Sequence, residues 1–100
     1  LVRLAQERDI GVIAMKPLGG FGMLGWLKSS PHIRSLNAKT LLRYALSNAC
    51  LSVVIPGMRF PWEVEENVAL ATSYRCLTSA QRERVHKRAQ TFLAEAARAA

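Results

Sequence analysis

Short continuous apolar runs and periodic apolar stripes alternate along this chain. Two runs are apolar without alternation, GVIAM at residues 11–15 and SVVI at residues 52–55, and a proline follows each within two residues. Runs of this kind are typical of parallel strands that are buried on both faces. The glycine-rich residues 18–37 predict a long loop after the first strand. The pattern therefore predicts two strands whose separation suits one crossover connection.

Apolar residues at helical spacing predict four helices around these strands. The first covers Leu1–Arg8, and the second covers about 38–48 with Asn37 as its N-cap. Pro61 fits the first turn of the third helix, and Thr78–Gln81 has the spacing of a capping box that opens the fourth. The apolar faces of the last three helices are expected to consist of Leu41, Leu42, Ala45 and Leu46; of Val64, Val68 and Ala71; and of Val85, Ala89, Phe92, Leu93 and Ala96.

Two strands that are apolar on both faces leave two open edges, and these helices are too few to cover them. We therefore expect the chain to belong to a larger parallel sheet or barrel.

A length of 100 residues allows at most one domain, and an apolar content of 50% argues against intrinsic disorder. No run approaches the roughly 20 apolar residues of a membrane span, and no secretory signal is visible, so the expected location is the cytoplasm.

The chain carries 14 basic and 7 acidic residues, a net charge of +7 that is spread along its length. Such a surplus suits either a nucleic acid or a small anionic ligand, and composition does not choose between them. Two histidines, His32 and His86, and two cysteines, Cys50 and Cys76, lack the spacing of metal ligands. We therefore expect no metal site, and so few cysteines fit a reducing compartment.

Four motifs follow one another along the chain: GVIAMKPLGG at 11–20, LRYALSN at 42–48, VVIPGMR at 53–59 and VEENV at 64–68. In this order they resemble the last part of the aldo-keto reductase family, over essentially all of residues 1–100. The resemblance implies an α/β fold, namely a C-terminal fragment of a (β/α)8 TIM barrel. The fragment would contain strands 7 and 8 with their helices and a C-terminal helix. A complete barrel needs about 250 residues.

The family transfers hydride between NADPH or NADH and a carbonyl compound at the carboxyl ends of the barrel strands. The resemblance thus implies the cofactor-binding segment of an NAD(P)-linked oxidoreductase, with a small carbonyl substrate for the full-length enzyme. The family's catalytic Tyr, Lys, Asp and His come from earlier strands, and no residue of this chain matches them. We expect no catalysis by this chain alone, and whether it acts as an enzyme stays open.

Ten positions match cofactor-binding residues of the family. Leu18, Gly19 and Gly20 correspond to the pyrophosphate loop, where glycines let backbone N–H groups approach phosphate oxygens and either Lys16 or Lys28 offers a charge. Met15 stands where many members carry an aromatic residue that stacks on the nicotinamide. The adenosine-phosphate clamp corresponds to Gly57, Met58, Arg59, Glu63, Glu66 and Asn67.

Preference between NADP and NAD is open. Many NADP-preferring members have Lys at the position of Gly57 and Arg at that of Glu63, whereas here Arg59 supplies the charge for a 2′-phosphate. Two alternatives also remain: a nucleic-acid-binding module built on the arginine-rich helix Gln81–Arg98, and an inactive product of a truncated gene. The nucleic-acid alternative is the less favoured, because no aromatic–basic interleaving or recognition helix is found.

Overall fold

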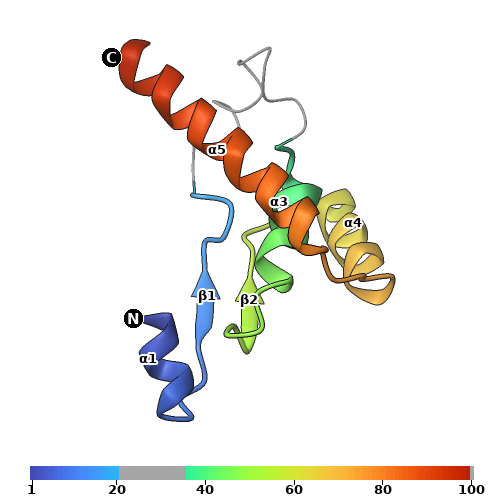
Figure 1. The fold of residues 1–100 in the computed structure, drawn as a ribbon. Coiled ribbons are helices and arrows are strands. Elements are labelled where there is room, and N and C mark those ends of the chain that lie inside the picture. Colours follow the sequence, from blue (N-terminus) through green and yellow to red (C-terminus); the bar gives the residue numbers. More distant parts are fainter. Residues whose placement is uncertain (21–35, 100) are drawn as a thin grey trace.

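A computed structural model describes residues 1–20 and 36–99 of the chain. In the described residues, the elements are α1 (Val2–Glu7), β1 (Ile13–Met15), α3 (Ala38–Leu46), β2 (Val53–Ile55), α4 (Pro61–Thr72) and α5 (Ser79–Ala99) (Figure 1). Each predicted helix and strand is present, although both strands begin later than predicted. Most of the predicted loop at 18–37, with Lys28 and His32, lies outside the described residues.

The two strands form a parallel sheet, as predicted. Ile13 lies opposite Val53 and Met15 lies opposite Ile55. Just before the strands, the carbonyl of Val12 accepts hydrogen bonds from the N–H groups of Ser52 and Val53, at 2.8 and 3.3 Å. The hydroxyl of Ser52 accepts from the N–H of Val12 at 3.2 Å. Parallel pairing brings the carboxyl ends of both strands to the same end of the sheet.

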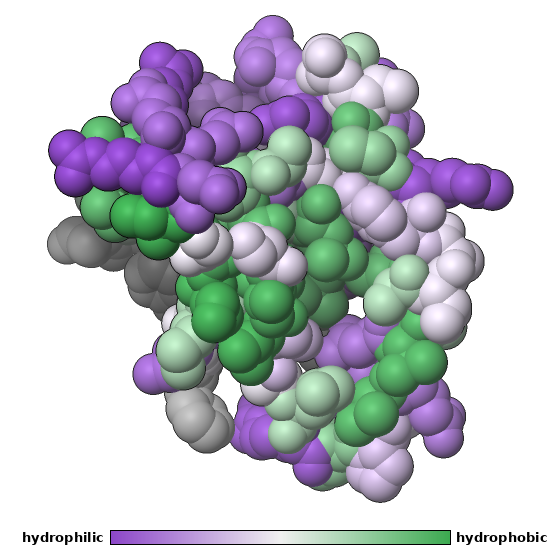
Figure 2. Space-filling model, turned by 90° about the horizontal axis from the view of Figure 1, so that it is seen from below, coloured by the Kyte–Doolittle hydropathy of each residue, from purple (hydrophilic) through white to green (hydrophobic). Residues whose placement is uncertain are grey.

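The two faces of this sheet differ in exposure, so the prediction that both are buried is wrong for the described structure. Ala14 and Val54 point to one face and are half-buried. The opposite face consists of Ile13, Met15, Val53 and Ile55, all exposed. The reason is that α3, which contacts β2, α4 and α5, gathers the helices on the Val54 side. Figure 2 shows that hydrophobic side chains also reach the surface in the middle of the side seen from below.

The small core lies between α3 and α5. Leu36, Val85 and Phe92 are buried together, and partly buried apolar residues pack around them. The prediction of an inward stripe on α5 is correct for Val85 and Phe92 but wrong for Leu93, which is 63% exposed. One residue turns a helix by about 100°, which carries Leu93 away from the side that Phe92 buries. Leu36 was not predicted, because it lies in the residues assigned to the loop.

Helix α4 buries a residue that the pattern did not mark. Leu70 is its buried side chain, whereas Val64 and Val68 are exposed, and so is Ala71. The expected apolar face of α4 is therefore only loosely covered. Its side chains border a cavity against β2 instead of packing tightly on the sheet.

The predicted helix starts are confirmed. The side chain of Asn37 accepts a hydrogen bond from the N–H of Thr40 at 2.9 Å, and Pro61 is the first residue of α4. Thr78 and Gln81 cap each other, since each side chain accepts from the other residue's N–H, at 3.2 and 3.0 Å. Local polar caps thus mark where α3 and α5 begin, and a proline marks the first turn of α4.

Ser47 joins the end of α3 to the connection between α4 and α5. It is only 4% exposed, and its hydroxyl donates to the carbonyl of Arg43 at 2.7 Å. The same oxygen accepts from the N–H of Leu77 at 2.9 Å and from the hydroxyl of Tyr74 at 3.4 Å. Tyr74 also donates to the carbonyl of Leu46 at 2.9 Å. These bonds fix the path of the chain between α4 and α5.

Candidate functional site

The loop after β1 has an unusual backbone. Lys16, Gly19 and Gly20 all have positive φ angles, of 53°, 76° and 74°. The N–H of Gly19 donates to the carbonyl of Lys16 at 2.9 Å, which closes a tight turn. A Cβ on Gly20 would meet only the Lys16 side chain, at 4.0 Å, so glycine is favoured there by the φ angle and not by lack of space. Leu18, between them, is half-buried.

The loop after β2 leads into α4 and is fixed by a carboxylate. Glu63 accepts hydrogen bonds through Oε2 from the N–H groups of Arg59 and Phe60. A carboxylate in this place satisfies N–H groups that the start of a helix leaves without partners. Glu63, predicted as a cofactor-binding position, thus has a capping role in this structure. Gly57 and Arg59 are exposed beside it.

Both loops leave the sheet at the same end. Met15 and Ile55 are paired residues at the ends of their strands, and neighbouring strands lie about 4.8 Å apart. Lys16 and Pro56, the first residues of the two loops, therefore start side by side. Met15 itself points to the open face of the sheet and is 70% exposed.

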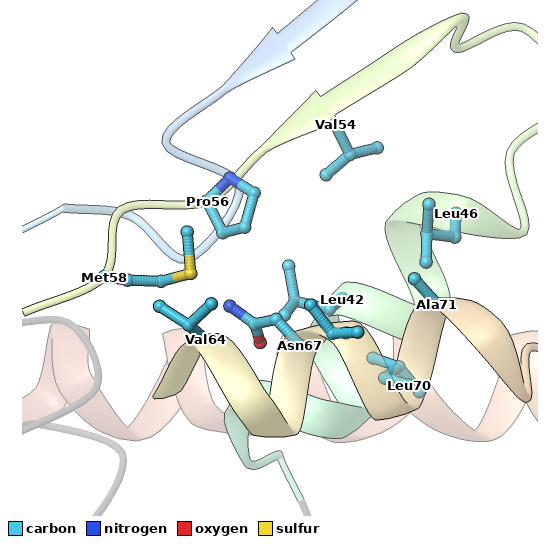
Figure 3. A pocket seen from close by; sticks show the side chains of 10 residues that line it. Leu42, Leu46, Val54, Pro56, Met58, Val64, Asn67, Leu70 and Ala71 are labelled. Atoms are coloured by element: carbon cyan, nitrogen blue, oxygen red, sulfur yellow. The ribbon is translucent and has the colours of Figure 1, made fainter. Parts of the chain in front are cut away.

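A cavity of about 240 Å³ lies on the opposite side of the sheet, between β2, α3 and α4. Its lining consists of Leu42, Leu46, Val54, Pro56, Met58, Val64, Asn67, Val68, Leu70 and Ala71. Figure 3 shows Val54, Pro56 and Met58 reaching in from β2 and its loop, and Asn67 from α4. Asn67 is the polar member of this lining, and its side-chain amide lies among the apolar side chains that surround the cavity (Figure 3). An amide set among apolar side chains suits a largely apolar ligand with one polar edge.

The structure brings some of the predicted residues together and leaves others apart. Met58 and Asn67 line the cavity, and Gly57, Arg59 and Glu63 lie in or beside the loop that leads to it. Glu66 is exposed, and its position on α4 is about 100° around the helix from Asn67. Met15, at the end of β1, and Leu18, Gly19 and Gly20, in the loop after it, do not line this cavity.

Two features of this surface were missed from the sequence. Phe60 and Trp62, both more than half exposed, stack with ring centroids 6.0 Å apart and planes 8° from parallel. Trp62 is the second residue of α4, and the helix turns it outward. The close spacing of aromatic residues at 60 and 62, across the start of a helix, is the signal that points to such a pair.

Cys76 is the other missed feature, since the sequence showed only that its spacing does not suit a metal ligand. Hydrogen bonds to Tyr74 and Ser47 lower the pKa of this thiol, and the positive charges of Arg82 and Arg43 act in the same direction. Slight burial opposes them. Nothing local in the sequence indicates this arrangement, because Ser47 and Arg43 lie about 30 residues earlier in the chain.

The described residues, 1–20 and 36–99, offer neither a metal-binding cluster nor a membrane-spanning helix. No group of three or more His, Cys, Asp or Glu side chains there is arranged to hold a metal ion. No helix in that part of the chain is both long and apolar enough to cross a bilayer.

Comparison with known proteins gives no further assignment. No protein-family model, no curated protein and no solved structure matches this chain. The functional reading therefore depends on the motifs and on the geometry of these two loops and the cavity.

Proposed function

We propose that this chain is the cofactor-binding C-terminal part of an NAD(P)H-dependent aldo-keto reductase. The observation that carries the proposal is the parallel register of β1 and β2, which starts the two glycine-bearing loops at adjacent positions. Ligands of parallel α/β folds bind at the carboxyl ends of the strands, where both loops lie. The motifs that resemble the family, at residues 11–20, 42–48, 53–59 and 64–68, include both strands and the starts of both loops.

The proposed pyrophosphate site is the turn at Gly19 and Gly20. Turns can present backbone N–H groups to an anion, and the positive φ angles of Gly19 and Gly20 belong to such a turn. The N–H of Gly19 already donates to the carbonyl of Lys16, so the proposal assigns the phosphate to the N–H of Gly20. In this proposal Leu18 lies beside the same phosphate, and Met15, on the open face, packs against the nicotinamide ring. A thioether packs on a ring through its polarisable sulfur, more loosely than an aromatic residue does.

The proposed adenosine site is the cavity with Met58 and Asn67. Pockets for drug-sized ligands have volumes of about 300 to 1,000 Å³, so a cavity of about 240 Å³ fits one ring system and not a whole dinucleotide. The Asn67 amide would bind the polar edge of that ring. Glu66, exposed on the neighbouring side of α4, is proposed to contact the adenosine from outside the cavity.

Arg59 and Gly57 bear on the choice between NADP and NAD. Arg59 is exposed beside the cavity, and an arginine fork binds phosphate through two parallel hydrogen bonds. The carboxylate of Glu63 is held by backbone N–H groups, which reduces its repulsion of a nearby phosphate. Gly57 has open space where a Cβ would be, so a ligand can pass close to its backbone. The proposed site accepts NADP or NAD, and Arg59 is the residue expected to distinguish the 2′-phosphate of NADP.

Isothermal titration of the chain with NADPH and with NADH tests the proposal. We expect saturable binding of at least one cofactor, with a dissociation constant at or below the millimolar range. Asn67→Leu should weaken both cofactors, whereas Gln90→Leu, on the exposed surface of α5, should change neither. Saturation by neither cofactor at millimolar concentration would contradict the proposal.

A second arm separates the two cofactors. If Arg59 binds the 2′-phosphate, Arg59→Gln should weaken NADPH by about tenfold, the loss of roughly 1.4 kcal/mol that one charged hydrogen bond is worth, and leave NADH unchanged. Arg8→Gln, an exposed charge in another part of the fold, is the matched control. Equal losses for both cofactors would assign Arg59 no role at the 2′-position.

A further inference from the structure

Helix α5 carries an ordered stripe of positive charge that the proposed cofactor site does not use. This basic stripe consists of Arg84, Lys87, Arg88 and Arg98, and all four side chains are exposed. With about 100° of turn per residue, they fall within an arc of about 100° on one side of Val85. The side of α5 that carries Val85 and Phe92 is buried in the core. The packing of α5 therefore turns the basic stripe outward.

The stripe keeps a net positive charge, because only two carboxylates lie in or beside its arc of four cations. Glu95 lies within the same arc, and Glu83 lies at its margin, 3.9 Å from the Lys87 ammonium. In the described part of the chain, no ion pair joins Arg84, Arg88 or Arg98 to a carboxylate. Arg84 and Arg88 are four residues apart on one helix face, where like charges repel. A polyanion laid along the stripe would relieve this repulsion.

The length of the stripe fits the backbone of a nucleic-acid duplex. From residue 84 to residue 98 the helix rises about 21 Å, and a duplex presents about twelve phosphate charges over that distance. Figure 1 shows α5 continuing past α3 toward the C-terminus, so that its far half extends beyond the other labelled helices. A rigid helix with four cations along one side matches an extended anion better than a small one, which contacts only one or two of them.

A lipid surface fits these observations less well. Helices that lie on membranes bury an apolar face in the lipid beside their basic face. In α5 most of that apolar face, with Val85 and Phe92, is buried against Leu36. Leu93 is exposed, but it lies about 80° from Val85 on the side away from the basic stripe. Only charged and polar groups remain along the stripe to meet an anionic surface.

We propose that the basic stripe of α5 binds the phosphate backbone of double-stranded nucleic acid without reading its sequence. The contacts are charge–phosphate pairs, and binding releases the counterions that the phosphates held. This surface is separate from the proposed cofactor site and does not depend on it.

Fluorescence anisotropy with a labelled 20-base-pair duplex tests the proposal. With four phosphate contacts, the logarithm of the binding constant should fall against the logarithm of the salt concentration with a slope of about −3.6. The binding constant should therefore decrease roughly 150-fold between 50 and 200 mM salt. Two variants of equal net charge then separate the stripe from charge in general. The stripe variant is Arg84→Gln, Lys87→Gln, Arg88→Gln and Arg98→Gln, and the control is Arg3→Gln, Arg8→Gln, Lys39→Gln and Arg75→Gln.

The stripe variant should bind at least tenfold more weakly than the control and lose most of the salt slope. Circular dichroism checks that both variants keep their helices, and glutamine is a good helix former. A third variant carries lysine at the three arginine positions of the stripe and keeps its charge, so it should still bind the duplex. It tests the proposal even if the glutamine variant unfolds. Equal losses in the two glutamine variants, a flat salt response, or stronger binding to phosphatidylserine vesicles than to the duplex would each overturn the proposal.

Discussion

Replacing Ser47 by alanine tests whether the buried hydroxyl holds α3 to the chain that connects α4 and α5. The change removes one oxygen that is only 4% exposed and introduces no new group. It leaves the N–H of Leu77 without its acceptor at 2.9 Å, and Tyr74 loses one of its two acceptors. The donated bond to the carbonyl of Arg43 is also lost, although that carbonyl keeps its helical partner, the N–H of Ser47.

The expected cost follows from the donor that is left unsatisfied. A buried polar group without a partner costs about 1 to 3 kcal/mol, so we expect Ser47→Ala to lower the free energy of unfolding by about 2 kcal/mol. In a chain of this length that corresponds to a fall in Tm of roughly 8 to 16 °C. Urea unfolding followed by circular dichroism measures the free energy of unfolding, and the dependence on urea should keep its slope. A thermal melt followed by the same signal measures the Tm.

Ser73 supplies a matched control. It follows α4 as Ser47 follows α3, and its hydroxyl donates to the carbonyl four residues earlier at 2.7 Å, but it is exposed. Ser73→Ala should change the free energy of unfolding by less than about 0.5 kcal/mol, because water replaces the lost bond. Equal effects of the two substitutions would refute the argument that Ser47 acts through burial and through Leu77.

Three further predictions concern the helix cap, the glycine turn and the cysteine. Asn37→Ala removes the acceptor of the Thr40 N–H and should cost about 1 kcal/mol of unfolding free energy by urea titration. Gly20→Ala places a Cβ on a residue with φ of 74° and should cost about 1 kcal/mol in the same assay, although space is available. Because its pKa is lowered, Cys76 holds more thiolate near neutral pH than an ordinary thiol, so iodoacetamide should alkylate it faster than Cys50. Tyr74→Phe removes a hydrogen bond to the thiol and should slow the alkylation of Cys76. An unchanged rate would contradict the hydrogen bond as the cause of the lowered pKa.

The elements and their caps could be predicted because their signals are local. An uninterrupted apolar run at residues 11–15 followed by a proline indicates a strand whatever surrounds it, and the same holds at residues 52–55. Asn37 and the pair Thr78 and Gln81 interact with residues three positions away. The parallel pairing also follows from sequence, since a crossover with a helix joins the two strands.

Packing across the chain could not be predicted in the same way. Ser47 and Leu77 are 30 residues apart, and their hydrogen bond depends on how α3 and α5 cross. The burial of Leu36 likewise depends on where Val85 and Phe92 come to lie. The pattern on α4 marks apolar residues but not the side of the helix that meets its neighbours, which is why Leu70 was missed.

The sequence could place both candidate loops directly after the strands. It could not show that the sheet separates the predicted cofactor-binding residues onto two sides. Met15 lies on the open face of the sheet, while Asn67 lies in the cavity behind β2. One ligand that reaches both must cross the carboxyl end of β2 beside Pro56 and Gly57. The φ angle of Gly57 is not positive, and no described atom lies within 4 Å of a Cβ placed there, so the fold itself does not require glycine at this position. A ligand that lies against the backbone at residue 57 would give the glycine a purpose, which is the role that the proposed dinucleotide site assigns to it.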